Sequence, residues 1–468
     1  MLKPFWTLVV LYSIGISAIL RADFNYIDDM ERAAYGYKAW EGFGRYLSNF
    51  LSTFIHADNY LTDVSPLPQM IAVVFLALAG IIVTNSITGQ KTFSMWTFVA
   101  LIPLGLSPYF LECMSYKYDA PYMALSILAS VFPILLSGFN SLVYFGSVVG
   151  GTLIMCTTYQ ASSGIFPMMV VLLCSKNWNE GESIKKLLRF SFKSLLGYVM
   201  GLLIFKFFFM ESVDSYVQNS IARFDQLIPV ALNNLHRYFE FIRTDFKHEW
   251  LYLIILMAIA FVVVMVKDSK RKKYIAFLLS VLTLILLCLM SFGIYPFFNK
   301  PLFEPRAMYG FGIFLAFLGV CIAASEKLFG AKIPILLLSW SFFVFSFTYG
   351  NALNVQKQYT DFRIHMVIDD LSAASWDEEK IVQISGTIGF SPVIKNMPQD
   401  YQMINRMVPI TFSGPWYWGQ FGFYNYYGLK HVIWDSSVDL TMFDLPVLQD
   451  TMYHTIKGND SYILIELK

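Results

Sequence analysis

Long apolar runs alternate with short polar connections along the first three quarters of the chain. A helix that crosses a bilayer needs roughly 17–25 predominantly apolar residues, and on this criterion we predict about eleven transmembrane helices. The fourth and fifth runs are separated only by SGFN, and the sixth is short. The predicted helices lie near 5–20, 67–84, 93–111, 121–136, 142–158, 164–174, 194–210, 250–266, 274–292, 307–324 and 333–349.

Three segments are too long to be simple connections between these helices. They are residues 21–66, residues 211–249 and everything after about Gly350. We therefore predict a transmembrane module over residues 1–350, with two large loops on one side of the membrane, and a separate domain over residues 351–468. The fold class is an α-helical polytopic membrane protein with a C-terminal α/β domain.

The tail after Gly350 has mixed periodicity. Residues 359–371 have helical spacing, and three short runs are rich in β-formers. These runs are KIVQIS at 380–385, HVIWDS at 431–436 and SYILIELK at 461–468. The aromatic-rich stretch 411–428 either stacks on a polysaccharide or packs the domain against the membrane.

The positions of lysine and arginine predict the orientation. Residues 176–193 and 267–273 carry dense basic clusters, which the positive-inside rule places in the cytoplasm. Counting from these loops puts the N-terminus in the cytoplasm, and it puts residues 21–66 and the C-terminal domain in the periplasm of a bacterial inner membrane. A cleaved signal peptide is the alternative for the first run, but ISAILRADF contains no clean small-x-small cleavage site.

Composition supports a membrane protein and excludes several other classes. Of the 468 residues, 56% are hydrophobic and 14% are charged, and the mean hydropathy is +0.53. Soluble domains carry roughly 25% charged residues. The net charge of +1 gives no basic surface for nucleic acid. The five cysteines fall in or beside apolar runs and the six histidines are scattered, as is typical of surface or loop positions, so no disulfide framework, metal site or cofactor is indicated.

An acidic segment follows the first apolar run. Residues 21–46 contain Asp23, the Asp28–Asp29 pair and Glu31, together with Arg32, Arg45 and the aromatic residues Tyr26, Tyr35, Tyr37 and Trp40. Ordinary helix capping in a solvated loop would explain the acids. The alternative is a sugar site, because carboxylates bind hydroxyls, aromatic faces cover C–H surfaces and cations bind a phosphate.

A second polar group lies on the same predicted side of the membrane. Glu112, Lys117 and Asp119 fall within SPYFLECMSYKYDAP, and Gln160, Glu304 and Arg306 follow in later connections. Interfacial anchoring within an aromatic belt is the simpler explanation. The functional explanation is that these residues line a charged vestibule on the outer side of the membrane.

Four stretches carry a resemblance to a known family. They are NYIDDMERAAYGYKAWEGFGRYLSNFL, DVSPLPQM, SPYFLECMSYKYDAP and TYQAS, in this order over roughly residues 20–165, with FEPRAMYG as weaker support. Together they resemble the bacterial and prophage glucosyltransferases that modify O-antigen and convert serotype. That family belongs to the GT-C glycosyltransferases, which are multi-span enzymes with outward active sites.

The resemblance implies transfer of glucose from undecaprenyl-phosphate glucose to an O-antigen sugar on the periplasmic face. Some GT-C enzymes need a divalent metal and many do not, and nothing in this sequence demands one. The resemblance also implies two functional partners, a polyprenyl-phosphate glucosyl synthase and a flippase. If the donor is β-linked and the reaction inverts, the product is α-linked.

The reaction needs a base for the acceptor hydroxyl and cations for the phosphate leaving group. We predict that one of Asp28 and Asp29 is the base and that the other orients it or the sugar, because adjacent side chains on a helix point about 100° apart. Lys206 is a further phosphate candidate, although snorkelling to the interface also explains it. The predicted substrate- and phosphate-binding residues are Asn25, Arg32, Arg45, Asp63, Glu112, Lys117, Asp119, Gln160, Glu304 and Arg306.

Two other functions remain open at this stage. The first is a GT-C transferase that performs the same type of transfer with another sugar, or to another acceptor such as lipid A or protein. A flippase or transporter of lipid-linked sugars predicts charges near the bilayer midplane and paired half-repeats, whereas the acidic clusters lie at one rim and no repeat is visible. An acyltransferase would need a histidine- or serine-centred nucleophile, which the sequence does not present.

Overall fold

The computed structural model describes residues 2–89, 93–210, 221–326, 328–373, 380–397, 402–414, 422–429 and 438–468. The chain folds into two compact units. The first unit contains Met1–Ser17, Ala39–Asp58 and Val64–Phe347. The second contains Ala18–Lys38, Asn59–Asp63 and Thr348–Lys468. Most of the acidic segment is therefore grouped with the C-terminal part of the chain.

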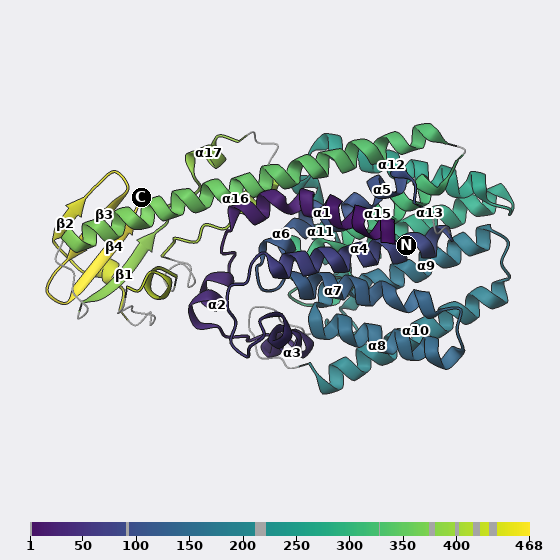
Figure 1. Ribbon diagram of the computed structural model, residues 1–468, viewed down its shortest axis with the longest axis horizontal. Coiled ribbons are helices and arrows are strands. Elements are labelled where there is room, and N and C mark those ends of the chain that lie inside the picture. Colours follow the sequence, from purple (N-terminus) through teal and green to yellow (C-terminus); the bar gives the residue numbers. More distant parts are fainter. Residues whose placement is uncertain are drawn as a thin grey trace. The chain divides into compact units, whose positions relative to one another are not determined.

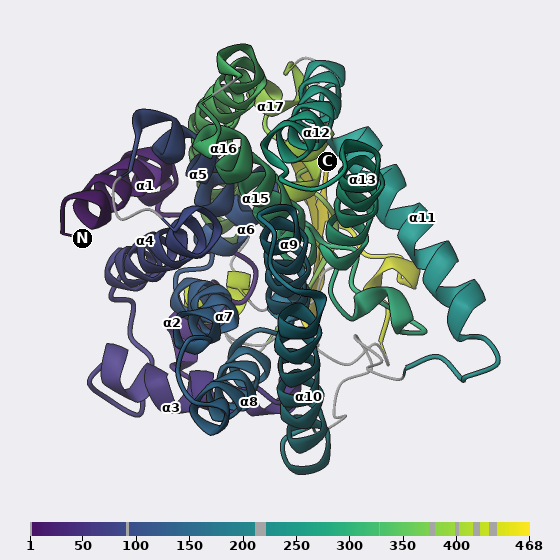
Figure 2. The same cartoon turned by 90° about the vertical axis from the view of Figure 1, so that its right-hand side faces the viewer.

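The first unit is a helical bundle whose helices run back and forth side by side (Figures 1 and 2). The most extensive helix pairings are α4 with α7, α8 with α10, and α5 with α15. The helices of this unit, including α1 and α16 which continue into the second, are α1 (Leu2–Ala22), α3 (Tyr46–Ile55), α4 (Leu67–Thr88), α5 (Met95–Leu106), α6 (Pro108–Ser115), α7 (Ala120–Val131), α8 (Ser141–Thr158), α9 (Ile165–Asn179), α10 (Ile184–Phe208), α11 (Leu227–Asp245), α12 (His248–Asp268), α13 (Lys273–Met290), α14 (Pro305–Met308), α15 (Gly310–Ala324) and α16 (Ile333–Ala373), with short turns η1 (Glu41–Phe43), η2 (Phe132–Leu136), η3 (Gln160–Gly164), η4 (Tyr295–Phe297) and η5 (Phe329–Lys332).

Each of the apolar runs predicted as a span contains a helix. Within the described residues, eight helices are long and apolar enough to cross a membrane, or nine if the bent pair α5 and α6 forms one span. The pair bends by 56°. Ala120–Leu136 and the 15-residue α9 are shorter. The chain is thus a polytopic helical protein, and the count of about eleven spans stays a prediction.

Helix α15 lies at the centre of the bundle, because every one of its residues from Gly310 to Ala323 is buried. Small residues let it approach α5 closely: a Cβ at Gly319 would lie 3.2 Å from the Cβ of Ala100, and one at Gly312 would collide with the side chain of Ser107. Close approach of this kind is the usual way in which helices pack together in a membrane. It fixes the position of α14, which directly precedes α15 and carries Arg306.

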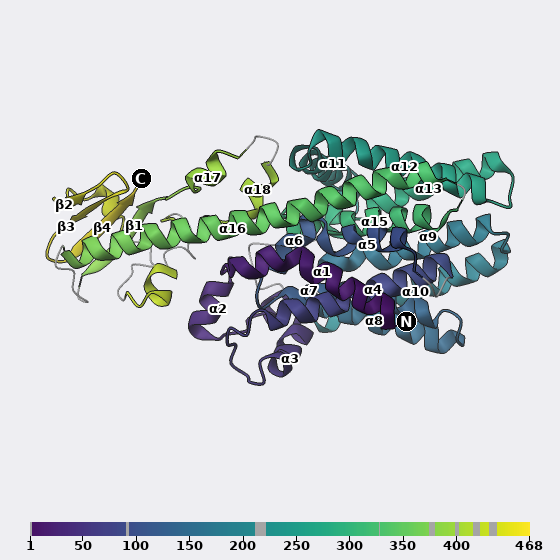
Figure 3. The same ribbon diagram turned by 45° about the horizontal axis from the view of Figure 1, so that its top comes forward.

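The second unit contains a four-stranded sheet in the order β1-β4-β3-β2 (Figure 3). The strands are β1 (Ile381–Gly386), β2 (Val447–Asp450), β3 (His454–Gly458) and β4 (Tyr462–Leu467). β1 runs parallel to β4, and β3 is antiparallel to both β2 and β4.

Ile364 and Val367 of α16 share a buried core with Val382, Ile456 and Ile463 of the sheet. Apolar burial of roughly 25 cal/mol per Å² therefore holds the helix to the strands. The small C-terminal sheet and the helical spacing of residues 359–371 are confirmed. Two of the predicted β-rich runs form β1 and β4, and the third, HVIWDS, lies outside the described residues.

Short helices complete the second unit: α2 (Asp29–Tyr35), α17 (Pro392–Lys395), α18 (Gln402–Met407), η7 (Gly422–Tyr426) and η8 (Leu440–Met442). α2 packs against η7, and a Cβ at Gly422 would collide with the sulfur of Met30. The hydroxyl of Tyr26 donates to the carbonyl oxygen of Met407 at 2.7 Å. The part of the acidic segment that belongs to this unit is therefore packed against its other elements.

Candidate active site

A buried ion pair joins two of the predicted residues in the first unit. Arg306 Nη1 donates to Glu112 Oε1 at 2.9 Å, and the backbone N–H of Arg306 donates to Oε2 at 2.5 Å. Glu112 is 1% exposed. Glu304, at the position before α14, is close enough to interact electrostatically with Glu112. Taking two charges out of water costs several kcal/mol per ion, so the presence of a buried pair of this kind is weak evidence for a stabilising role.

Tyr159 links Arg306 to two more predicted residues. Its hydroxyl donates to the carbonyl oxygen of Arg306 at 3.3 Å, and the guanidinium carbon of Arg45 lies 4.5 Å from the centre of its ring. Arg45 Nε is 3.4 Å from Gln160 Oε1, and Gln160 Nε2 donates to the carbonyl oxygen of Phe43 at 2.9 Å. The guanidinium groups of Arg45, at the start of α3, and of Arg306, in α14, are thus held by contacts within the first unit.

The connection between α6 and α7 carries the other predicted charges of this unit. Lys117 and Asp119 are 4% and 5% exposed. Trp40 donates from its indole Nε1 to Asp119 Oδ1 at 2.6 Å. The Trp40 ring is itself buried and packs edge-on against Tyr122, with the ring centres 5.1 Å apart. These two charged side chains are therefore buried within the first unit.

The structure reveals residues that sequence reasoning missed. Trp40 was recognised only as one aromatic among several, and its bond to Asp119 is invisible in the sequence. Asp245 at the end of α11 is 3% exposed and accepts a hydrogen bond from the Tyr109 hydroxyl at 3.0 Å. An acid just before an apolar run, as in FIRTDFKHEW, is the signal that would have found it.

Of the five histidines within the described residues, His236, His248 and His365 are exposed and two are buried. His431 lies outside those residues. His56 is 7% exposed and stacks on Tyr118, and His454 is fully buried beside Asp370. Lys206 is exposed on α10, as snorkelling requires. Among the described residues, no group of three or more histidine, cysteine or acidic side chains is placed to hold a metal ion.

The Asp28–Asp29 pair belongs to the second unit, and its two members have different surroundings. Asp28 directly precedes α2, its side chain is 36% exposed, and it lies 4.0 Å from Arg32 one helical turn later. Asp29 is fully buried, and its Oδ2 accepts the backbone N–H of Tyr26 at 3.0 Å. Only Asp28 presents a carboxylate to the outside.

Glu31 is a further carboxylate on α2, and Tyr37 donates a hydrogen bond to it. Burial raises the pKa of Glu31 above its ordinary value, and the Tyr37 bond and Arg32 oppose this rise. Of the other predicted residues in this unit, Asp63 is exposed just before α4, whereas Asn25 lines a cavity with Lys357 and Asp361.

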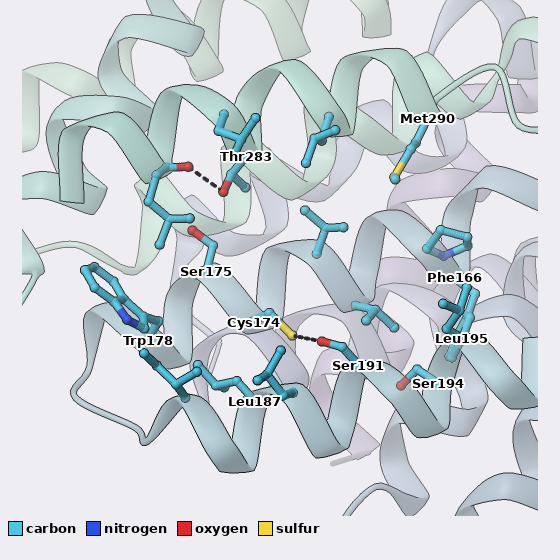
Figure 4. Close-up of a pocket in the computed structure, with 18 of the residues that line it drawn as sticks. Phe166, Cys174, Ser175, Trp178, Leu187, Ser191, Ser194, Leu195, Thr283 and Met290 are labelled. Carbon is cyan, nitrogen blue, oxygen red and sulfur yellow. Dashed lines mark hydrogen bonds between the residues drawn. The ribbon is translucent and has the colours of Figure 1, made fainter. Parts of the chain in front are cut away.

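An apolar groove of about 520 Å³ opens between α9, α10 and α13 of the first unit (Figure 4). Of the hydroxyls that line it, Ser191 Oγ lies 3.0 Å from Cys174 Sγ, and Thr283 donates to the carbonyl oxygen of Leu279 at 2.7 Å. The hydroxyl of Ser175 has no hydrogen-bond partner among the described residues. Figure 4 shows Trp178 at one end of the groove and Phe166 at the other. Phe166 lies in the first turn of α9, directly after the η3 turn that begins with Gln160.

Comparison with known proteins adds an independent finding. Residues 17–317 match the family described as "Glucosyl transferase GtrII". The chain is also 23% identical over 418 residues to an uncharacterised 55.3 kDa protein encoded in the gtrB 5′ region of Salmonella phage P22, with 84% of each chain covered. No solved structure matches the chain.

Proposed function

Because the chain belongs to the GtrII family of glucosyl transferases, we propose that it transfers glucose from a polyprenyl-phosphate donor, undecaprenyl-phosphate glucose, to a sugar of O-antigen. The reaction takes place at the periplasmic face of the bacterial inner membrane and changes the serotype of the lipopolysaccharide. A glucosyl synthase and a flippase supply the donor on that face.

One observation carries the choice of a lipid-linked donor. The apolar groove begins at Phe166, directly after the η3 turn that carries Gln160, and Gln160 contacts Arg45. A prenyl chain needs a dry hydrocarbon surface, and its phosphate needs cations close to where that surface ends. The groove and the guanidinium groups of Arg45 and Arg306 offer these two features within one unit.

The chemistry follows from the donor. The bond between the anomeric carbon and the phosphate oxygen breaks, and the polyprenyl phosphate leaves with the electron pair. The acceptor hydroxyl oxygen forms the new bond to the anomeric carbon and gives its proton to a carboxylate. Arg306 and Arg45 neutralise the negative charge that grows on the phosphate, as fixed donors do in other charge-developing reactions.

For the carboxylate that takes the proton we propose Asp28. Its side chain is partly exposed and has a cation, Arg32, as a neighbour. Asp29 is fully buried and accepts a backbone N–H, so it positions the start of α2. Asn25, Arg32 and Asp63 are proposed to bind substrate in the second unit, and Lys117, Asp119, Gln160 and Glu304 in the first.

The first test is transfer in membranes of an O-antigen-producing strain. Membranes that contain the chain are given polyprenyl-phosphate glucose or polyprenyl-phosphate mannose, and the polysaccharide is analysed by mass spectrometry. We expect added hexose with the glucose donor alone. Transfer of mannose, or modification of lipid A or protein in place of O-antigen, would overturn the assignment.

A matched pair of variants tests the groove. Leu195 lines it and the adjacent Leu196 does not, although both side chains are exposed on α10. We expect Leu195→Trp to raise the KM for a long-chain donor about tenfold, or 1.4 kcal/mol, and to leave a short citronellyl-phosphate donor unaffected. Leu196→Trp should change neither. Equal effects on both donors would show that the groove does not hold the prenyl chain.

A further inference from the structure

A second, polar cavity lies wholly within the second unit. Its volume is about 240 Å³. The segment before α2, one face of α16 and the end of η7 form its wall, through Asn25, Lys357, Thr360, Asp361, Tyr426 and Tyr427. Drug-sized ligands occupy roughly 300–1,000 Å³, so this cavity suits a single sugar ring better than a long oligosaccharide.

One side chain of the wall has an unmet hydrogen-bonding requirement. Thr360 is 4% exposed, and its hydroxyl has no hydrogen-bond partner within the described ranges. A buried hydroxyl without a partner costs roughly 1–3 kcal/mol. Threonines on helices usually meet this requirement by bonding the carbonyl one turn earlier, which Thr360 does not do. A hydroxyl of a bound ligand would supply the missing partner.

The charged groups of the wall favour a neutral ligand. Lys357 is held by Asp23, whose carbonyl oxygen lies 2.7 Å from its Nζ and whose Oδ2 lies 3.5 Å away. Tyr427 donates its hydroxyl to Asp361 Oδ1 at 3.1 Å. A bound phosphate would be repelled by the carboxylate of Asp361, and its natural partner, Lys357, is already paired with Asp23. A neutral ligand with several hydroxyls could instead form hydrogen bonds with the acceptors and donors of the wall.

An aromatic surface borders these groups. Tyr426 is 44% exposed, and its ring centre lies 5.2 Å from that of Tyr427 with the planes at 71°. An exposed tyrosine face suits the C–H surface of a pyranose, because its ring is apolar and its hydroxyl remains in water. The cavity thus combines an aromatic surface, the ring of Tyr426, with hydrogen-bonding groups.

We propose that this cavity binds one sugar ring of the acceptor polysaccharide, with ring hydroxyls on Thr360 and Asp361 and the C–H face on Tyr426. The proposal rests on the proposed function for the identity of the glycan. It makes the C-terminal unit the part of the chain that holds the acceptor.

Binding to the intact chain in detergent tests the proposal. The probe is O-polysaccharide released by mild acid from the unglucosylated lipopolysaccharide of the strain used in the transfer assay, and saturation-transfer difference NMR reports binding. We expect Thr360→Val and Tyr426→Ala to weaken binding about tenfold, or 1.4 kcal/mol, and Thr360→Ser to restore it. Ser372→Ala, on the same helix, and Phe443→Ala, which is 45% exposed, lie outside the cavity and should bind like the intact chain.

Kinetics separate this proposal from the proposed function. In the transfer assay, the two cavity variants should raise the KM for polysaccharide and leave the KM for donor unchanged. If the intact chain transfers glucose and both variants bind and react normally, the cavity proposal is overturned and the function stands. If the intact chain transfers no glucose but binds polysaccharide, and the two variants do not bind it, the proposed function is overturned and the cavity proposal stands. Thermal unfolding in detergent confirms that the variants are folded.

Discussion

Trp40 donates its indole N–H to the carboxylate of Asp119 at 2.6 Å, across a sequence separation of 79 residues. Both side chains are buried. The bond ties the connection before α3 to the connection between α6 and α7. Because this hydrogen bond holds the buried carboxylate of Asp119 in one orientation, Asp119 can serve as a fixed element of a binding site.

Trp40→Phe should therefore weaken both the fold and the site. The variant keeps an aromatic ring but leaves Asp119 without its indole donor, which costs roughly 1–3 kcal/mol. We expect a lower thermal unfolding temperature in detergent and reduced glucosylation. Trp6→Phe, at a position that is 58% exposed on α1, is the control and should alter neither. An unchanged unfolding temperature in Trp40→Phe would contradict the structural role.

The Glu112–Arg306 pair gives a second prediction. Removing one partner of a buried pair costs roughly 3–5 kcal/mol, whereas replacing both with apolar residues is often neutral. We expect Glu112→Gln or Arg306→Gln to destabilise the protein strongly. The double variant Glu112→Leu/Arg306→Met should regain stability and remain inactive, as measured by thermal unfolding and by glucosylation.

An exposed ion pair provides the comparison for that experiment. Lys186 and Glu182 lie 2.7 Å apart, with side chains 71% and 37% exposed. Lys186→Gln should change stability by about 0–1 kcal/mol. If the double variant at Glu112 and Arg306 were fully active, the pair would be structural only.

The acidic pair of α2 gives a third prediction. General bases contribute about 10²–10⁴-fold to rate, so Asp28→Asn should lower kcat by at least about 100-fold without loss of folded protein. Asp29→Asn keeps an oxygen that accepts the Tyr26 N–H and should retain most of the activity. Asp58→Asn, at an exposed position with no proposed role in the site, is the control for loss of a negative charge. Normal activity in Asp28→Asn would show that Asp28 is not the base, which would then be sought at Asp63, Glu112 or Asp119.

His454 gives a prediction about pH. Burial lowers its pKa below the ordinary value of 6.5, Arg363 and Lys468 lower it further, and Asp370, whose Oδ2 is 2.8 Å away, opposes the shift. The folded state thus binds fewer protons than the unfolded state just below pH 6.5. Because the unfolded state binds more protons, the free energy of unfolding that His454 contributes is fully present above this pH and declines as the pH falls.

Unfolding of the second unit between about pH 7 and pH 5.5 measures this decline. We expect the intact chain to lose stability over that range and His454→Gln to lose less. His365→Gln, at an exposed histidine of α16, should behave like the intact chain. An equal decline in all three proteins would assign the pH dependence to other groups.

The helices and strands were largely predictable because local pattern decides them. An apolar run of bilayer length has few options besides a helix, since its backbone groups must be satisfied within the segment. Each predicted run accordingly contains a helix, and KIVQIS and SYILIELK form β1 and β4. The candidate residues were predictable as types, because charges beside apolar runs are expensive and stand out.

The amino-acid sequence by itself determined that this protein is a multi-span helical chain with a small α/β part, and that its charges gather at the ends of apolar runs. The tertiary structure alone decided which charges meet. Glu112 pairs with Arg306 across 194 positions, Asp29 turns inward while Asp28 stays exposed, and Ala18–Lys38 joins the C-terminal unit. The physical reason is that periodicity acts over a few residues, whereas the partner of a buried polar group is selected by packing between segments that are distant in sequence.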